Sequence, residues 1–273
     1  MRALGIMQGR LLPPIDGRIQ AFPADRWREE FPRAAEAGLD AIEWIYETHG
    51  SERNPLGTDA GLVELRELSS RHGVAVRSVC ADYFMERPLV RASAAELTER
   101  LAHLEWLIDR SARAGIERIV LPFVDASDVR TPEEEDALVE MLRQMEPKAS
   151  AAGVELHLEM SFGPQRVARL LEKLPAPIRI NYDSGNSASL GYHPSEEFAA
   201  YGSRIGSVHV KDRLRRGTTV PLGTGDADLA AFFSGLAQLG YDGDVILQVA
   251  RGETGSEVEW ARQNAAVVRS ALA

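Results

Sequence analysis

Short apolar runs alternate with longer amphipathic segments along the whole chain, and this alternation constrains the fold most strongly. The runs are rich in Val, Ile and Leu and too short for helices, which is typical of strands buried on both faces. Eight such runs occupy residues 4–7, 41–45, 74–79, 119–124, 154–158, 178–182, 205–210 and 245–249. Between them, apolar residues at helical spacing predict helices over 26–37, 58–72, 93–114, 131–152, 164–174, 194–201, 228–239 and 256–272.

Glycines stand between several predicted helices and the strands that follow them. Glycine tolerates the left-handed conformation that ends a helix, so Gly38, Gly73, Gly115, Gly153 and Gly240 are interpreted as helix-to-strand turns. Eight βα units in series predict an α/β protein with a (β/α)8 TIM barrel, formed as a single domain over residues 1–273. A doubly wound open sheet is the alternative, weakened because no Gly-x-Gly-x-x-Gly phosphate-binding sequence follows the first strand.

Composition excludes several classes of partner. The 273 residues carry a formal net charge of −10, whereas duplex DNA and anionic membranes need a basic footprint. The apolar stretches are far shorter than the roughly 20 residues that span a bilayer, and the N-terminus lacks a long apolar signal segment. The one cysteine, Cys80, cannot form an internal disulfide. We therefore expect a cytoplasmic protein with no nucleic-acid or membrane partner.

Polar residues gather at the ends of the last four predicted strands, where the catalytic loops of such a barrel lie. Glu159, Asp183, His209 and Gln248 stand at similar depth on neighbouring strands. Two carboxylates, an imidazole and an amide oxygen form a set that suits Mn²⁺, Mg²⁺, Co²⁺ or Zn²⁺. Spacing alone leaves a structural interpretation open, because a buried histidine is often a satisfied core residue and a strand-end glutamate often caps a helix.

Other polar residues near the strand ends are candidates for binding substrate. Glu43 is expected to bind substrate hydroxyls or to hold Lys211, with a structural ion pair as the alternative. Lys211 points inward and needs a carboxylate or a substrate anion beside it. Arg251 suits a phosphate or carboxylate, or else is a solvated loop arginine. Gln8 is expected to line the pocket at the end of the first strand.

The loops after the sixth and seventh strands provide further candidates. Asn186 is placed in the loop after the sixth strand, close to Asp183. The loop over residues 211–226 contains Arg213 and two further arginines, which either close over an anionic substrate or only carry surface charge. His157 shares a strand face with Glu159, because side chains alternate along a strand with a period of two residues.

Four sequence segments resemble the xylose-isomerase-like TIM barrels, and within them the sugar-phosphate isomerase/epimerase group. They are Gly5-Ile6-Met7-Gln8-Gly9-Arg10-Leu11, Tyr182-Asp183-Ser184-Gly185-Asn186, Val208-His209-Val210-Lys211-Asp212 and Pro221-Leu222-Gly223-Thr224-Gly225-Asp226. The resemblance covers essentially all eight βα units.

The resemblance implies one bound divalent metal ion, with Mn²⁺ foremost and Mg²⁺, Co²⁺ or Zn²⁺ as alternatives. Carried over by position, it implies the ligands Glu159, Asp183 and His209, with Gln248 where the family has a second glutamate. An amide oxygen can bind a metal but cannot take up a proton at neutral pH.

The resemblance also implies a sugar or sugar-phosphate isomerase/epimerase. The family reaction removes a proton next to a carbonyl while the metal stabilises the enediolate. Glu159, Gln248 and Lys211 are the expected catalytic residues, with Glu159 as the obvious base. The loss of the second glutamate favours one-base isomerisation or elimination of water from a keto-polyol, as in inosose dehydratases. Epimerisation needs a second proton source, for which His157, Lys211 and Glu43 are candidates.

Other functions on this barrel were weighed. A DNA-repair endonuclease of the endonuclease IV group is rejected, because that group holds a zinc cluster with several histidines and this chain has six in all. A sugar-binding barrel without turnover stays open because of Gln248. The expected partner is a small-molecule sugar or sugar phosphate, and the family resemblance suggests a homodimer or homotetramer.

Overall fold

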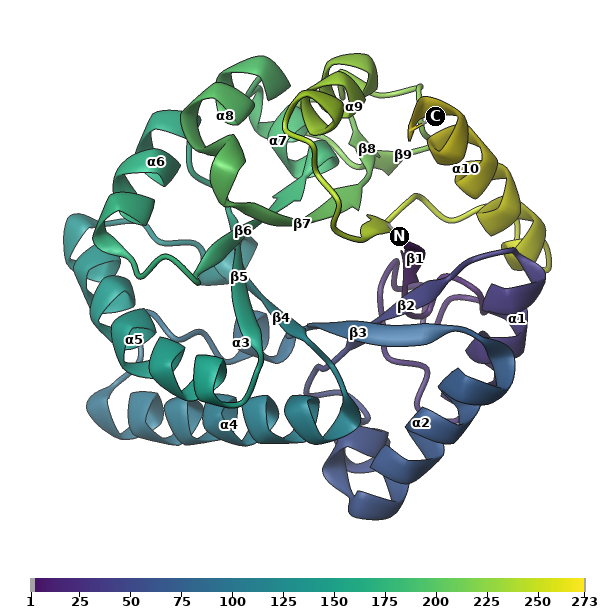
Figure 1. The fold of residues 1–273 in the computed structure, drawn as a ribbon, viewed down its shortest axis with the longest axis horizontal. Helices are drawn as coiled ribbons and strands as arrows, with labels where there is room; N and C mark the ends of the chain where they lie inside the picture. Colours follow the sequence, from purple (N-terminus) through teal and green to yellow (C-terminus); the bar gives the residue numbers. More distant parts are fainter. Residues whose placement is uncertain (1–2, 273) are drawn as a thin grey trace.

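The computed structural model describes residues 3–272 and shows a closed barrel of eight parallel strands inside a ring of helices (Figure 1). The order around the barrel is β1-β10-β7-β6-β5-β4-β3-β2, so every strand pairs with its sequence neighbours and the ring closes between β1 and β10. The strands are β1 Leu4–Met7, β2 Ala41–Ile45, β3 Ala75–Cys80, β4 Arg118–Phe123, β5 Glu155–Met160, β6 Arg179–Asp183, β7 Ile205–Val210 and β10 Val245–Leu247. This topology confirms the predicted (β/α)8 TIM barrel.

Helices cover the outside of the barrel and pack their apolar faces against the strands (Figure 1). The α-helices are α1 Glu30–Glu36, α2 Asp59–His72, α3 Tyr83–Glu86, α4 Ala94–Ala114, α5 Pro132–Ala151, α6 Pro164–Lys173, α7 Ser184–Leu190, α8 Pro194–Tyr201, α9 Leu229–Gln238 and α10 Glu257–Leu272. The five glycines predicted as turns all have positive φ. Short 3-10 turns occupy Trp27–Glu29, Ser51–Arg53, Pro55–Gly57, Asp125–Ser127 and Gly202–Arg204.

The structure differs from the predicted elements mainly near the catalytic end. The last strand ends at Leu247, so Gln248 follows the strand, although its N–H still bonds the Val210 carbonyl. The predicted helix over 26–37 is a 3-10 turn followed by the shorter α1. The segment 211–226 contains an antiparallel hairpin, β8 Asp212–Arg213 with β9 Thr219–Val220. The short helices α3 and α7 were not predicted.

The two ends of the barrel have different chemistry. At the amino end of the strands, buried Asp244 accepts hydrogen bonds from Arg77 and Arg118, which closes that end with an ion-pair cluster. At the carboxyl end, buried carboxylates and His209 line the interior. Within residues 3–272, no helix is both long and apolar enough to cross a membrane.

Candidate metal centre

Glu159, Asp183 and His209 converge at the carboxyl ends of three adjacent strands, β5, β6 and β7. One ligand atom from each lies within 4.8 Å of the other two, and all three side chains are buried. His209 Nδ1 is 3.4 Å from Glu159 Oε2 and 3.8 Å from Asp183 Oδ2. The register of the sheet causes this, because Asp183 pairs directly with His209 across β6 and β7.

The opposite nitrogen of the His209 ring is held by Glu43. His209 Nε2 lies 2.6 Å from Glu43 Oε1, and neither side chain is exposed. Burial opposes ionisation of Glu43, but the charge of His209 and the hydrogen bond to it lower the pKa of this carboxyl. Burial likewise disfavours the imidazolium, yet Glu43, Asp183 and Glu159 together raise the pKa of His209 well above its usual value. The expectation that Glu43 holds Lys211 is therefore wrong, because it holds His209.

Two asparagines orient the carboxylate of Glu159. Asn186 Nδ2 donates to Glu159 Oε1 at 2.5 Å, and Asn181 Nδ2 donates to Glu159 Oε2 at 3.2 Å. Asn186 lies in the first turn of α7 rather than in a loop, which corrects its predicted placement. Asn181 was missed, although it shares a strand face with Asp183 two residues later, which was the available signal.

Lys211 and Gln248 form the remaining edge of the site. Lys211 Nζ lies 3.3 Å from Asp183 Oδ2 and donates to Gln248 Oε1 at 2.8 Å. The predicted need of Lys211 for a carboxylate is met by Asp183. Burial raises the pKa of Asp183, but the positive charge of Lys211 and the hydrogen bond and charge of His209 outweigh it and hold this pKa below the usual range.

These residues fit a divalent cation. Two carboxylates and one imidazole nitrogen form a compact donor set, and a carboxylate on the far side of a ligating imidazole is the usual support for such a ligand. The bond to Glu43 leaves Nδ1 directed at the carboxylates. Gln248 Oε1 accepts a hydrogen bond from the ammonium group of Lys211. For this oxygen to join the donor set, Lys211 would have to give up one or both of its hydrogen-bond partners.

His157 and Gln8 lie away from this donor set. His157 is fully buried, and its ring nitrogens contact Ser207 Oγ and Glu155 Oε2. Gln8 is also fully buried in the barrel wall, where its Oε1 accepts the N–H of Ile45. The structure thus places both of these predicted substrate-binding residues within the barrel packing.

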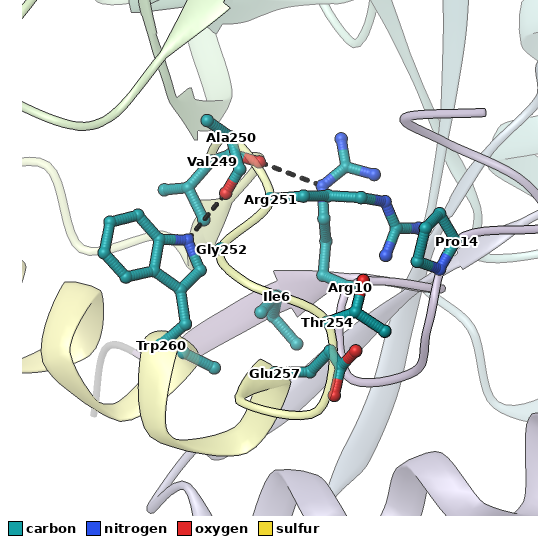
Figure 2. Close-up of a pocket in the computed structure, with 11 residues that line it drawn as sticks. Ile6, Arg10, Pro14, Val249, Ala250, Arg251, Gly252, Thr254, Glu257 and Trp260 are labelled. Atoms are coloured by element: carbon teal, nitrogen blue, oxygen red, sulfur yellow. Dashed lines mark hydrogen bonds between the residues drawn. The ribbon is translucent and has the colours of Figure 1, made fainter. Parts of the chain in front are cut away.

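Arg251 holds the long segment that follows β1. Its guanidinium donates to the backbone carbonyls of Gly9, Leu12 and Ile19. Figure 2 shows Arg251 and Arg10 together at a cavity of about 30 Å³, and Arg10 donates to the Val249 carbonyl there. A cavity of that size holds about one water molecule and is too small for a phosphate. The structure therefore does not bring Arg251 to the metal centre.

The basic loop over residues 211–226 is folded back on itself and onto α7. The carboxylate of Asp212 accepts three backbone N–H groups, from Gly223, Gly225 and Ala227. Arg213 donates to Asn186 Oδ1 at 2.8 Å, so it positions the side chain that holds Glu159. The sequence left the arginines of this loop open between closing over an anionic substrate and carrying surface charge, and the structure shows this indirect role for Arg213.

Comparisons with known proteins agree with the barrel fold. A family model described as xylose isomerase-like TIM barrel matches residues 31–271. No curated protein matches the chain.

Three solved structures illustrate the similarity of the fold. An L-ribulose 3-epimerase is 18% identical, with a TM-score of 0.80 over 100% of this chain and 95% of that one. The IOLI protein with a bound zinc atom is 18% identical, with a TM-score of 0.77 over 99% and 98%. A xylose isomerase-like TIM barrel protein from Mycobacterium smegmatis in complex with magnesium is 21% identical, with a TM-score of 0.73 over 100% and 98%. The match of the family model over most of the sequence shows that this chain belongs to the xylose isomerase-like TIM barrel family.

Proposed function

We propose that the chain is a divalent-metal-dependent sugar or sugar-phosphate isomerase/epimerase that removes a proton from the carbon next to a carbonyl. The observation that carries this proposal is the convergence of Glu159, Asp183 and His209 within 4.8 Å at the catalytic end of the barrel. The family includes sugar epimerases and isomerases, and solved structures with this fold include an L-ribulose 3-epimerase. The substrate is a small-molecule sugar or sugar phosphate, and Mn²⁺ is the metal that we favour.

Glu159, Asp183 and His209 would hold the cation, with the oxygen of Gln248 as a fourth ligand once Lys211 has moved. When bound, the cation supplies positive charge that stabilises the enediolate oxygen. Glu43 keeps the His209 ring in the orientation that directs Nδ1 toward the carboxylates. Metal binding requires neutral His209, so the raised pKa of this group predicts that binding releases a proton.

Glu159 is the proposed base. Its two carboxylate oxygens are fixed by Asn186 and Asn181, so little reorientation is needed when a proton is transferred. Lys211 lies at the same edge and would donate a hydrogen bond to a substrate oxygen in place of Gln248.

Elimination of water from a keto-polyol, or sugar binding without turnover, is the second candidate. Gln248 favours it, because an amide bonded to Lys211 cannot serve as the second carboxylate of a two-base epimerase. The expectations of a cytoplasmic location, of one domain and of a homodimer or homotetramer belong to the same proposal.

The proposal is tested by proton NMR of D-fructose, D-tagatose, L-ribulose and a keto-inositol incubated in D₂O with the Mn²⁺-loaded protein. We expect one of these compounds to exchange the hydrogen next to its carbonyl for deuterium, and Glu159→Gln to abolish the exchange. Exchange by Glu159→Gln at the wild-type rate contradicts the assignment of the base. No exchange of any ketone probe by the wild type contradicts the proposed reaction.

A further inference from the structure

A second carboxyl group lies at the catalytic end of the barrel, across from His209 and two strands away from Glu159. Asp82 follows β3 by two residues, and β3 is four places from β7 in the ring of eight strands, which is directly across the barrel. Asp82 is partly buried and begins the turn that leads into α3. Its position was not singled out from the sequence, because no motif surrounds it.

Gln20 connects Asp82 by hydrogen bonds to Gln248, at the edge of the metal centre. Gln20 Nε2 donates to Asp82 Oδ2 at 2.7 Å, and Gln20 Oε1 accepts from Gln248 Nε2 at 3.1 Å. Gln248 Oε1 in turn accepts from Lys211 Nζ, which also contacts Asp183. One carboxamide therefore spans the distance between Asp82 and the ligand edge of the site.

The pattern presented by Gln20 matches what a ketose would present. Its oxygen accepts from Gln248, while its nitrogen, which is bonded to the same carbon, donates to Asp82. The carbonyl and the adjacent hydroxyl of a hydroxyketone offer the same acceptor and donor side by side. Gln20 also lies in the irregular segment after β1, in which residues 16–19 are exposed, so it can move without disturbing a strand.

The surroundings of Asp82 suit proton transfer near neutral pH. Burial raises the pKa of Asp82 to about 6, the nearby carboxylates of Glu47 and Glu159 add to the rise, and hydrogen bonds from Gln20 and Cys80 oppose it. The charge of Arg10 also interacts with Asp82. A carboxyl with such a pKa exchanges protons readily at pH 6–7.

We propose that Asp82 is the second acid–base residue of the site and acts on the substrate face opposite Glu159, in the place that Gln20 spans here. The inference rests on the proposed function and deepens it toward epimerisation. Glu159 takes the proton, the C–H electron pair becomes the C=C bond of the enediolate, and the π pair of the carbonyl moves onto its oxygen. Protonated Asp82 then gives its proton to the other face of that carbon, where the C=C pair forms the new C–H bond and the oxygen pair re-forms the carbonyl. Exchange with water returns Glu159 and Asp82 to their starting protonation states.

The other candidates for this role are engaged elsewhere. Glu43 is fully buried against His209, and His157 is buried between Ser207 and Glu155. Gln248 has no proton-accepting carboxylate. Lys211 is partly exposed, but its ammonium group contacts Asp183 and Gln248 at the ligand edge. Asp82 is a partly exposed carboxyl at the end of a different strand, bonded to a side chain that a substrate can displace.

The test compares Asp82→Asn with the wild type, both loaded with Mn²⁺, on the ketose probes in D₂O, following deuterium incorporation and epimer formation by NMR. Asparagine can still accept from Gln20, so the fold and Mn²⁺ affinity are expected to persist. We expect epimer formation to fall by about 100-fold or more, while deuterium still enters with retained configuration at a rate close to that of the wild type. Glu86→Gln, an exposed carboxyl on the same α3, is the matched control and should resemble the wild type.

The outcomes distinguish failure of the role of Asp82 from failure of the proposed function. Epimer formation by Asp82→Asn at the wild-type rate overturns the role of Asp82, and so does parallel loss of exchange and epimerisation. If the wild type exchanges no probe, the proposed function fails and the role of Asp82 with it. Exchange that persists in Asp82→Asn without epimer formation supports the role, because a structural defect would lower both rates together.

Discussion

His209 Nε2 lies 2.6 Å from Glu43 Oε1 inside the barrel, with neither side chain exposed to solvent. The bond spans the barrel interior from β7 to β2, which are not neighbours in the sheet. It fixes the ring so that Nδ1 meets Glu159 and Asp183, and a negative charge behind a ligating imidazole makes the nitrogen a stronger donor. The geometry of the metal centre thus depends on a residue that does not face the proposed cation.

The Glu43→Gln variant is expected to bind Mn²⁺ about 10- to 100-fold more weakly than the wild type, because the neutral amide supports His209 less well. Titration calorimetry with Mn²⁺ measures this directly. Glu36→Gln, an exposed position on α1, is the control and should leave the affinity unchanged. Equal affinity of the Glu43→Gln variant and the wild type would show that Glu43 does not support a ligand.

The ammonium group of Lys211 contacts Asp183 and Gln248, so it competes with a cation for the same oxygens. We therefore expect Lys211→Met to bind Mn²⁺ more tightly and to lose turnover if Lys211 also binds substrate. Lys148→Met removes an exposed lysine on α5 and serves as the control. Weaker Mn²⁺ binding by Lys211→Met contradicts the idea of competition.

Arg251 donates to three backbone carbonyls of the segment after β1. Arg251→Met should lower the free energy of unfolding by about 2–3 kcal/mol, because three carbonyls lose a charged donor. Hydrogen exchange in residues 9–20 should accelerate, whereas any affinity for inorganic phosphate should not change. A variant that keeps wild-type stability but loses phosphate binding would instead restore the interpretation of Arg251 as an anion site.

Glu30 is fully buried, and its Oε1 accepts from the Gly9 N–H while Oε2 has no hydrogen-bond partner. Burial raises the pKa of Glu30 from 4.5 to about 8, although the hydrogen bond from Gly9 opposes the rise. The folded chain therefore binds an additional proton between these values, so the contribution of Glu30 to stability falls as the pH rises from 4.5 toward 8.

Glu30→Gln removes this loss of stability with rising pH, because the amide is neutral at every pH and still accepts the hydrogen bond from Gly9. Thermal unfolding followed by circular dichroism should show a Tm that falls less between pH 5 and pH 8 than that of the wild type. Identical slopes for the two proteins would mean that Glu30 is not protonated in the folded state.

The sequence predicted the barrel well because the evidence for it is local. Each strand is a short apolar run, and five of the helix-to-strand turns contain a glycine with positive φ, as at Gly73 and Gly115. The convergence of Glu159, Asp183 and His209 also followed from the sequence, since parallel strands bring their carboxyl ends to one edge.

Partners across the barrel could not be predicted, because they depend on side chains separated by many residues. Glu43 was expected to bind substrate, to hold Lys211 or to form a structural ion pair, and it meets His209, 166 positions along the chain. The connection from Asp82 through Gln20 to Gln248 joins three separate loops, and of its three residues only Gln248 was singled out from the sequence. The contacts of Arg251 could not be predicted, because its carbonyl partners lie in an irregular segment that has no periodic sequence pattern.

The central claim, that Glu159, Asp183 and His209 hold a divalent metal ion, is tested most directly by the metal content of the protein after equilibration with Mn²⁺ and dialysis. The account predicts close to one Mn²⁺ per chain for the wild type and a loss of bound metal in Asp183→Ala, with both proteins folded. A wild-type chain that retains no Mn²⁺, Mg²⁺, Co²⁺ or Zn²⁺, or an Asp183→Ala variant that retains as much metal as the wild type, would contradict it.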